Sequence, residues 1–304
     1  MGEASPPALV PGAVRRLSAL ALPYSTRDRR ATELAAEQPH SAELLELYRA
    51  VLSLQSPVFE WVRTSRWRKR LQAASDDDPS QPFEGLPVGK LEKRFGRFTG
   101  ELAASGTDVL STAGIALAEA SARQRSELLR ATLERADVDA LADSLECETA
   151  ALAFYSRAFL QAVLEASITA ALEDDALENR VGKTNLACPR CGWPPQVAVL
   201  RDEAELKSRR LLVCALCATG WSFPRLACPG CDERDTEKLL CHEVESRPHL
   251  RIEECQVCRC YLKTVDLRRD GTAVPLVEDI ASVELDIWAE EKGLRKICPN
   301  LLGL

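Results

Sequence analysis

The feature that most constrains this chain is a series of four CxxC cysteine pairs between residues 188 and 258. In chain order the pairs are Cys188 and Cys191, Cys214 and Cys217, Cys228 and Cys231, and Cys255 and Cys258. The first and second pairs are 22 residues apart and the third and fourth are 23 apart, whereas only 10 residues separate the second from the third. One unit, a pair followed by a long hairpin and another pair, is therefore used twice, and tandem duplication is the simplest explanation.

Each unit contains the ligands of a tetrahedral metal site. Two residues between cysteines allow both sulfurs to turn toward one ion, and two such turns supply four thiolates. We predict that the first two pairs hold one metal ion and that the last two pairs hold a second. The alternative joins the second pair with the third and leaves the outer pairs to combine. Iron and zinc both accept four thiolates, and either ion would stabilise a rubredoxin-like or zinc-ribbon module too small to fold on a hydrophobic core alone.

The other four of the twelve cysteines are expected to remain outside the metal sites. We interpret them as ordinary, partly buried thiols, because two four-coordinate sites are complete without them. They are Cys147, which is expected to lie in a helix, and Cys241, Cys260 and Cys298. A third cluster, in which Cys241 acts with His242 and His249, is the alternative.

The first half of the chain is predicted to be an all-helical domain over residues 26–182, after an irregular tail over residues 1–25. It is rich in Ala, Leu, Glu and Arg, and apolar residues recur at steps of three and four. One helix is predicted over residues 41–54, with Ser41 as its N-cap directly after His40. The apolar stripes favour a bundle core over a cofactor site. We assign no catalytic residue here and interpret His40 as a solvated or capping residue.

Further elements are predicted from local composition. Residues 75–90 hold three aspartates, three prolines and two glycines, a composition typical of a loop. Helices are predicted over residues 108–120, 124–135 and 138–179, the last of them either long or broken once. Beyond residue 185 helical periodicity stops, and short, partly β-branched segments predict strands over residues 196–200, 210–213, 250–253 and 261–267.

The predicted fold class is therefore α+β, with an N-terminal helical bundle followed by two tandem small β modules. We expect the first metal module over residues 186–225 and the second, with a C-terminal segment, over residues 226–304.

Composition disfavours several classes of protein. The formal net charge is -7, and residues 186–304 hold 17 Lys and Arg against 19 Asp and Glu, so we expect no nucleic-acid binding. No uncharged apolar stretch is long enough to span a membrane, and the N-terminus does not read as a signal peptide, so a cytoplasmic protein is expected. A thiol oxidoreductase normally carries one CxxC motif at a helix N-terminus, which does not match four duplicated pairs.

The order of the C-terminal motifs resembles the formate dehydrogenase accessory proteins, the FdhE family. The resemblance rests on CPRCG, CALCATGW, CPGC and CQVCRCYLK, then on DIAS at residues 279–282, Leu285 with Asp286, and PNLL at residues 299–302. Ala218 follows the second pair where a glycine is common, and Cys260 and Cys298 look like additions to the family pattern. These departures affect the choice of metal more than the fold.

The resemblance implies a non-catalytic cytoplasmic maturation factor, a chaperone for the molybdopterin-containing catalytic subunit of respiratory formate dehydrogenase before its Tat export. It also implies iron at rubredoxin-like sites made by the eight paired cysteines. A cleft between bundle and modules, with Trp193, Trp221 and Tyr261 as contacts, is one hypothesis for the client surface, and core packing of these aromatics is the other. The competing functions are a zinc-ribbon module for another protein or for nucleic acid, and a redox-active thiol or iron protein.

Overall fold

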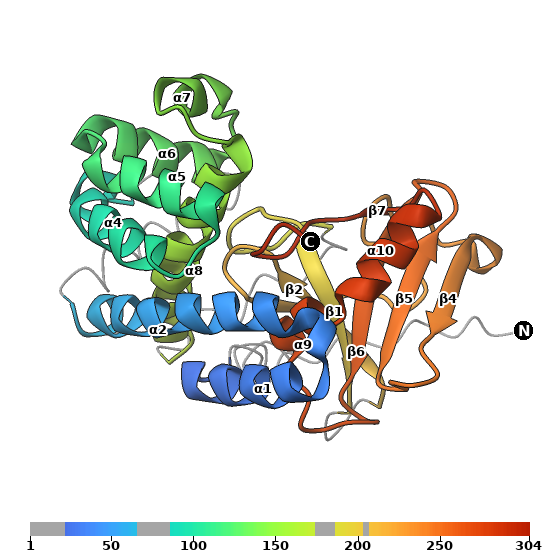
Figure 1. Cartoon of the computed structure of the whole chain (residues 1–304). Coiled ribbons are helices and arrows are strands. Elements are labelled where there is room, and N and C mark those ends of the chain that lie inside the picture. The colour runs from blue at the N-terminus through green and yellow to red at the C-terminus, as the bar shows by residue number, and fades with distance from the viewer. Residues whose placement is uncertain (1–21, 66–85, 174–185, 203–206) are drawn as a thin grey trace, which may run out of the picture.

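The computed structural model describes residues 22–65, 86–173, 186–202 and 207–304, which form a helical part and a β-sheet part packed side by side (Figure 1). The α+β fold class is confirmed. Most of the predicted N-terminal tail and most of the predicted loop at residues 75–90 lie outside the described residues. Where they can be compared, both ranges were too long, because a helix begins at Tyr24 and another at Val88.

The helical part is a bundle built around one apolar helix. Its members are α1 (Tyr24–Glu37), α2 (Ala42–Thr64), α4 (Val88–Ala103), α5 (Asp108–Glu119), α6 (Ala122–Glu134), α7 (Asp139–Ser144) and α8 (Thr149–Glu173). Helix α8 contacts α2, α4, α5, α6 and α7, and Leu152, Phe159 and Val163 on it are fully buried. A helix that is apolar on all sides is stable only at the centre of such a bundle. None of the helices in the described ranges has the length and hydrophobicity needed to cross a membrane.

The helix predicted at residues 41–54 is present and begins where predicted, but it ends ten residues later, at Thr64. Ser41 occupies the N-cap position without capping, since its hydroxyl is buried and donates to the Gln38 carbonyl at 3.2 Å. The helix continues through Pro57 to Thr64. Burial of Val58 and Val62 against the bundle explains this extension, because packing can outweigh the cost of a proline inside a helix.

The segment predicted as one long or once-broken helix is broken once, between α7 and α8. Cys147 lies in that break, so its predicted place in a helix is wrong. Glu146 adopts a left-handed conformation with φ 53°, which ends the helical path just before the cysteine.

The C-terminal half forms one seven-stranded sheet. The strands are β1 (Pro195–Arg201), β2 (Arg209–Cys214), β3 (Gly220–Ser222), β4 (Leu239–Glu243), β5 (Leu250–Cys255), β6 (Cys260–Asp266) and β7 (Arg295–Lys296). Their order is β3-β2-β1-β6-β5-β4, with β7 paired to the start of β6. All four predicted strand segments are confirmed.

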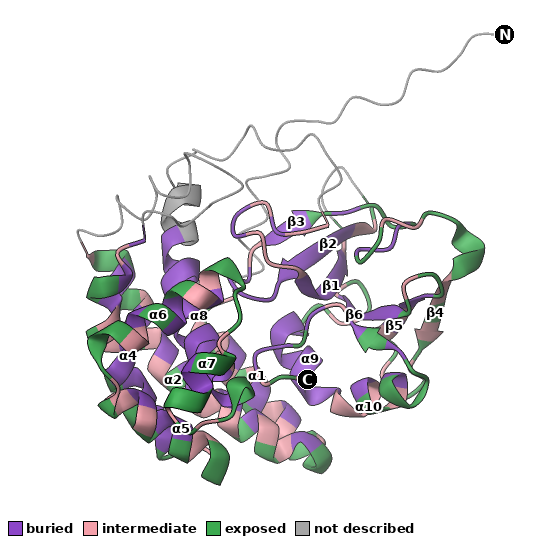
Figure 2. Ribbon diagram, turned by 90° about the horizontal axis from the view of Figure 1, so that it is seen from above, coloured by how far each residue is buried: buried purple, intermediate pink, exposed green. Residues whose placement is uncertain are grey.

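The two β modules are joined edge to edge. Each is an antiparallel three-stranded unit, and β1 of the first pairs in parallel with β6 of the second, from Val197 opposite Lys263 to Leu200 opposite Asp266. Strand β6 is buried along its whole length, whereas no residue of β4 is buried, as Figure 2 shows. The modules therefore share one sheet whose β4 edge is open to solvent.

Helix α9 (Pro275–Ala281) connects the bundle to the sheet, and α10 (Val283–Glu291) follows it. All seven residues of α9 are buried, and it contacts α1, α2, β1 and β6. Arg30 of α1 pairs with the buried Glu278 at 2.6 Å. These helices were missed in the sequence, although Pro275 at the first helical position, with Val277 and Ile280 three residues apart, is a helix signal.

Candidate metal centres

The first cysteine cluster is assembled from two turns at one end of the β1–β2 hairpin. Cys188 and Cys191 precede β1, while Cys214 is the last residue of β2 and Cys217 follows three residues later. The Sγ atoms of Cys188 and Cys217 are 3.6 Å apart, and those of Cys191 and Cys214 are 3.2 Å apart. Four sulfurs therefore converge on one point.

The second cluster repeats this layout. Cys228 and Cys231 precede β4, and Cys255 is the last residue of β5. The Sγ distances are 3.7 Å from Cys228 to Cys258 and 3.7 Å from Cys231 to Cys255. Both groups could hold a metal ion, and the sequential grouping of the pairs is the one that forms.

Backbone hydrogen bonds repeat with the same period as the cysteines. The Cys188 N–H donates to the carbonyl five residues ahead at 2.8 Å, and the Cys228 N–H, 40 residues later, does the same at 2.8 Å. The residue after each CxxC pair has positive φ: 70° at Gly192, 53° at Ala218, 60° at Asp232 and 56° at Arg259. A non-glycine residue in this conformation costs about 1–2 kcal/mol, so the turn geometry is maintained against local strain at three of the four positions.

The donor set fits a four-thiolate metal site. A tetrahedral ion with metal–sulfur bonds of about 2.3 Å requires sulfurs about 3.8 Å apart, close to the 3.2–3.7 Å in the two clusters. Backbone N–H groups also approach the sulfurs, as from Arg190 to Cys188 at 3.4 Å and from Gly230 to Cys228 at 3.3 Å. Such donors orient the ligands and stabilise their negative charge.

Without a cation among them, most of the cysteines whose pKa is shifted are disfavoured as thiolates by burial. Burial raises the pKa of Cys191 and Cys214 well above the usual thiol value. Although burial acts on Cys217 in the same direction, hydrogen bonds from the neighbouring thiols lower its pKa. In the second cluster, burial and Cys255 raise the pKa of Cys228 to about 12. A divalent ion offsets this effect because it binds all four groups as thiolates.

The first cluster is sealed inside the molecule. Its four cysteines are at most 4% exposed, and they belong to the same apolar core as the bundle helices. Arg157 of α8 is also buried and donates to the carbonyls of Ala215, inside the second turn, and of Pro299. Arg190, within the first turn, is 4% exposed. The Arg157 guanidinium therefore lies beside the site predicted to carry net negative charge.

The second cluster is open on one side. Cys231 is exposed and Cys258 is partly exposed, whereas Cys228 and Cys255 are buried. The difference between the two sites follows from the fold, because the bundle covers the first module and leaves the end of the second uncovered.

We therefore expect the second cluster to react first with a thiol reagent. With N-ethylmaleimide and a chelator present, its cysteines should be modified about tenfold faster or more than those of the first, since the first requires local opening before reagent can enter. Peptide mass spectrometry over a time course would measure this. The exposed Cys241, outside both clusters, supplies the rate of an unprotected thiol. Equal rates at the two clusters would contradict the expectation.

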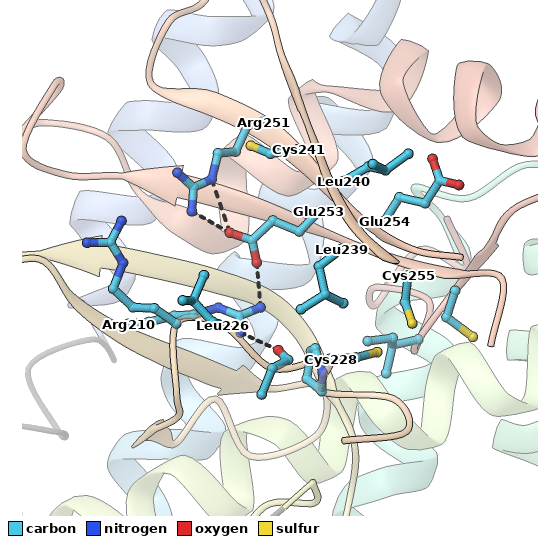
Figure 3. Close-up of a pocket in the computed structure, with 15 residues that line it drawn as sticks. Arg210, Leu226, Cys228, Leu239, Leu240, Cys241, Arg251, Glu253, Glu254 and Cys255 are labelled. Carbon is cyan, nitrogen blue, oxygen red and sulfur yellow. Dashed lines mark hydrogen bonds and ion pairs between the residues drawn. The ribbon is translucent and has the colours of Figure 1, made fainter. Parts of the chain in front are cut away.

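A pocket of about 230 Å³ adjoins the second cluster, and Cys228 and Cys255 form part of its wall. Figure 3 shows Glu253 at its centre, between Arg210 and Arg251, both of which donate to its carboxylate. Arg210 also donates to the Ala227 carbonyl at 3.0 Å. Nothing in the sequence pattern indicated this pocket, because β2, β5 and the third cysteine turn all contribute to it.

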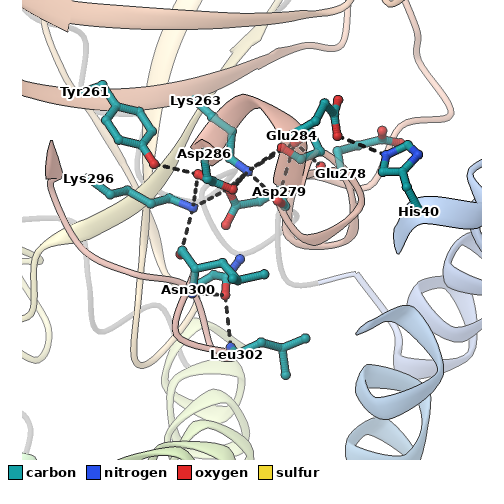
Figure 4. A network of polar contacts seen from close by, with 12 residues as sticks. His40, Tyr261, Lys263, Glu278, Asp279, Glu284, Asp286, Lys296, Asn300 and Leu302 are labelled. Carbon is teal, nitrogen blue, oxygen red and sulfur yellow. Dashed lines mark hydrogen bonds and ion pairs between the residues drawn. The ribbon is translucent and has the colours of Figure 1, made fainter. Parts of the chain in front are cut away.

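The sequence analysis also missed a buried network of charged side chains between the sheet and helices α9 and α10 (Figure 4). Lys263 lies 2.6 Å from Asp286 and 2.9 Å from Asp279, and Lys296 lies 2.8 Å from Asp279. The Tyr261 hydroxyl donates to Asp286 at 2.7 Å. Burial opposes ionisation of Asp279, yet the two ammonium groups hold its pKa below the ordinary value. Two positive and two negative charges balance, and the network ties α9, α10 and β7 to β6.

The remaining predicted residues lie apart from the two clusters. Cys241 is exposed on β4, His242 bonds Glu254 at 2.9 Å and His249 approaches Glu278 at 3.3 Å, so these three residues form no third cluster. Cys260 and Cys298 are buried. Trp221 and Tyr261 are both 4% exposed, as core aromatics are. His40 is half exposed and bonds Glu284 of α10 at 3.0 Å.

The β-sheet half of the chain is similar to proteins of a known family. The FdhE central domain matches residues 187–225, and the FdhE C-terminal domain matches residues 226–302. A "Protein FdhE homolog" from Aquifex aeolicus is 39% identical over 116 residues, which are 38% of this chain and 41% of the relative. A second, from Stutzerimonas stutzeri, is 36% identical over 146 residues, 47% of each chain. The matched region thus spans less than half of either curated relative.

A solved structure extends the likeness to the whole chain. The crystal structure of the FdhE protein from Pseudomonas aeruginosa matches with a TM-score of 0.66 and 25% sequence identity, over 95% of each chain. The resemblance seen in the cysteine motifs is thereby confirmed, and the helical half shares the arrangement.

Proposed function

We propose that this chain, whose residues 187–302 match the models of the FdhE central and C-terminal domains, is a non-catalytic accessory factor for formate dehydrogenase. In this proposal it binds the molybdopterin-containing catalytic subunit in the cytoplasm and is needed to obtain active enzyme. The observation that carries the proposal is the pair of four-cysteine clusters at the ends of two hairpins of a single sheet. Two cross-linked hairpins in one sheet would form a rigid surface, which favours binding a partner protein over catalysing a reaction.

The two clusters are proposed to hold one ion each, either iron or zinc. Bound there, the ion supplies a cross-link of four thiolates that holds each pair of turns together, and iron would add a one-electron couple. Three groups of residues in this chain support the sites. The turn amides orient the sulfurs, Arg157 offsets charge at the first site, and the buried network anchors the C-terminal segment.

Co-purification tests this function. Tagged wild-type protein from cells respiring formate should retain a formate dehydrogenase catalytic subunit, and the variants Cys188→Ala and Cys255→Ala should lose it together with one metal ion each. Cys147→Ala, outside both clusters, is the matched control and should behave as wild type. Retained proteins would be identified by mass spectrometry and metal measured on the same samples. A metal-loaded wild type that retains no such subunit would refute the proposal and favour a ribbon module for a different partner.

A further inference from the structure

The pocket beside the second cluster extends across β5 and reaches β4, the edge strand of the sheet. Leu239, Leu240 and Cys241 of β4 line it on one side, and Leu226 stands at its rim. Leu226 is 66% exposed, the largest fraction among the big apolar residues that are exposed in the described part of the chain. Val257, inside the turn that supplies Cys255 and Cys258, is also exposed, at 53%. Apolar side chains are therefore presented to solvent around the less protected metal site.

The size of the pocket selects the kind of ligand. Sites for drug-sized molecules or cofactors occupy about 300–1,000 Å³, and this pocket, at about 230 Å³, is smaller. It has room for an apolar side chain or two. An occupant that anchors one side chain and continues along the surface is an extended polypeptide segment.

The edge strand β4 supplies backbone hydrogen-bonding groups for such a segment. Strand β4 pairs with β5 on one side, and no described strand pairs with it on the other. Its outer N–H and C=O groups can accept a further strand, the mode in which main-chain hydrogen bonds give affinity and neighbouring pockets give specificity.

The charges around the pocket favour an acidic partner. Both carboxylates in its wall are already paired, Glu253 with two arginines and Glu254 with His242 and Arg259. Arg225, also in the wall, is exposed and forms no ion pair with any described residue. The available charge at the rim is therefore positive, and an Asp or Glu in the bound segment would complement it.

We propose that the β4 edge and this pocket are the client-docking surface, and that the occupant is an extended segment of the client subunit. The segment adds to β4, inserts an apolar side chain between Leu226 and Leu239, and sets an acidic residue against Arg225. This inference rests on the proposed function, because it names the surface through which that function is carried out.

The test measures binding of purified formate dehydrogenase catalytic subunit to the full-length, metal-loaded chain. The double variant Leu226→Asp/Arg225→Glu should bind about tenfold more weakly or worse, since it removes an apolar anchor and reverses the complementary charge. The matched control is Ile115→Asp/Arg97→Glu on the helical bundle, where Ile115 is 52% exposed and Arg97 is exposed. Metal content and circular dichroism of every variant establish that it is folded.

Hydrogen exchange on the same complex provides the second readout. Amides of residues 239–243 should become protected when the client binds, because an added strand engages the outer edge of β4. If wild type and both double variants bind equally, or if β4 gains no protection, the docking surface is wrong while the accessory function stands. If the control variant alone loses binding, the surface lies on the bundle. A folded wild type that binds no client refutes the function and the surface together.

Discussion

Replacing Cys214 by serine is expected to remove one metal ion and to unfold the first β module. Cys214 is fully buried, and its Sγ lies 3.2 Å from that of Cys191, so a serine leaves the remaining thiolates without a fourth soft ligand. A structural zinc site contributes about 10–16 kcal/mol of apparent binding free energy, whereas a whole domain is stable by only about 5–15 kcal/mol. Loss of one ion is therefore enough to unfold the module that it holds.

The unfolding should spread beyond the module, because the first cluster shares its core with α8. We expect thermal unfolding of the Cys214→Ser variant to begin well below that of wild type, with metal content reduced from two ions to one. Differential scanning calorimetry and elemental analysis would measure both quantities. Cys147→Ser, in the break between α7 and α8, should leave both unchanged. A Cys214→Ser protein with two ions and a wild-type transition would show that Cys214 is not a required metal ligand.

Replacing Arg27 by methionine is expected to destabilise the helical bundle by about 3–5 kcal/mol, the usual cost of leaving one member of a buried ion pair alone. Arg27 and Glu165 are each 1% exposed, and their two hydrogen bonds measure 3.0 and 2.9 Å. Tyr24 also donates to Glu165, at 3.2 Å. Methionine fills a similar volume but leaves the Glu165 carboxylate without its cation inside an apolar core.

A second substitution separates loss of the charge partner from loss of packing. In Arg27→Met/Glu165→Leu both charges are gone, so most of the stability should return, since replacing both partners of a buried pair by apolar groups is often close to neutral. Arg29→Met on the same helix is the matched control, because the Arg29 side chain is 70% exposed and surface pairs contribute little. Urea unfolding followed by circular dichroism measures all of these. A double variant no more stable than Arg27→Met would show that the arginine acts through packing.

The two cysteine clusters differ in their exposure to solvent. The first cluster lies between sheet and bundle, with Arg157 spanning from α8 to the turn that holds Cys214. The second faces solvent through Cys231 and adjoins the pocket at the β4 edge. Two modules of the same pattern therefore lie in two environments, one enclosed between sheet and bundle and the other exposed to solvent.

Much of this protein was predictable because its determinants are local. A CxxC turn places two sulfurs on one side through contacts within four residues, so the ligands and the duplication could be identified by spacing alone. The same holds for α5 and α6, which were predicted from apolar periodicity within a single helix, although α6 begins at Ala122, after the Ser121 cap, two residues earlier than predicted. The long segment after residue 138 was also correctly expected to be helical.

Predictions failed where distant contacts outweigh local preference. The helix predicted to end at residue 54 continues through Pro57 to Thr64, because Val58 and Val62 pack against the bundle. Lys263 and Asp279 had no visible relation in the sequence, although Lys263 lies 2.9 Å from Asp279 in the buried network.

The sequence by itself determined the four CxxC turns, the helical character of the first half and the α+β class, because each depends on residues a few positions apart, whereas the tertiary structure decided which turns converge on one site. Only the tertiary structure decided that β1 and β6 join the modules in one sheet, that α9 binds this sheet to the bundle, and that one cluster is sealed while the other is open. The physical reason is that strand pairing and burial depend on contacts between segments that are far apart in the chain. Two modules of nearly identical pattern therefore acquire different exposure from their neighbours rather than from their own residues.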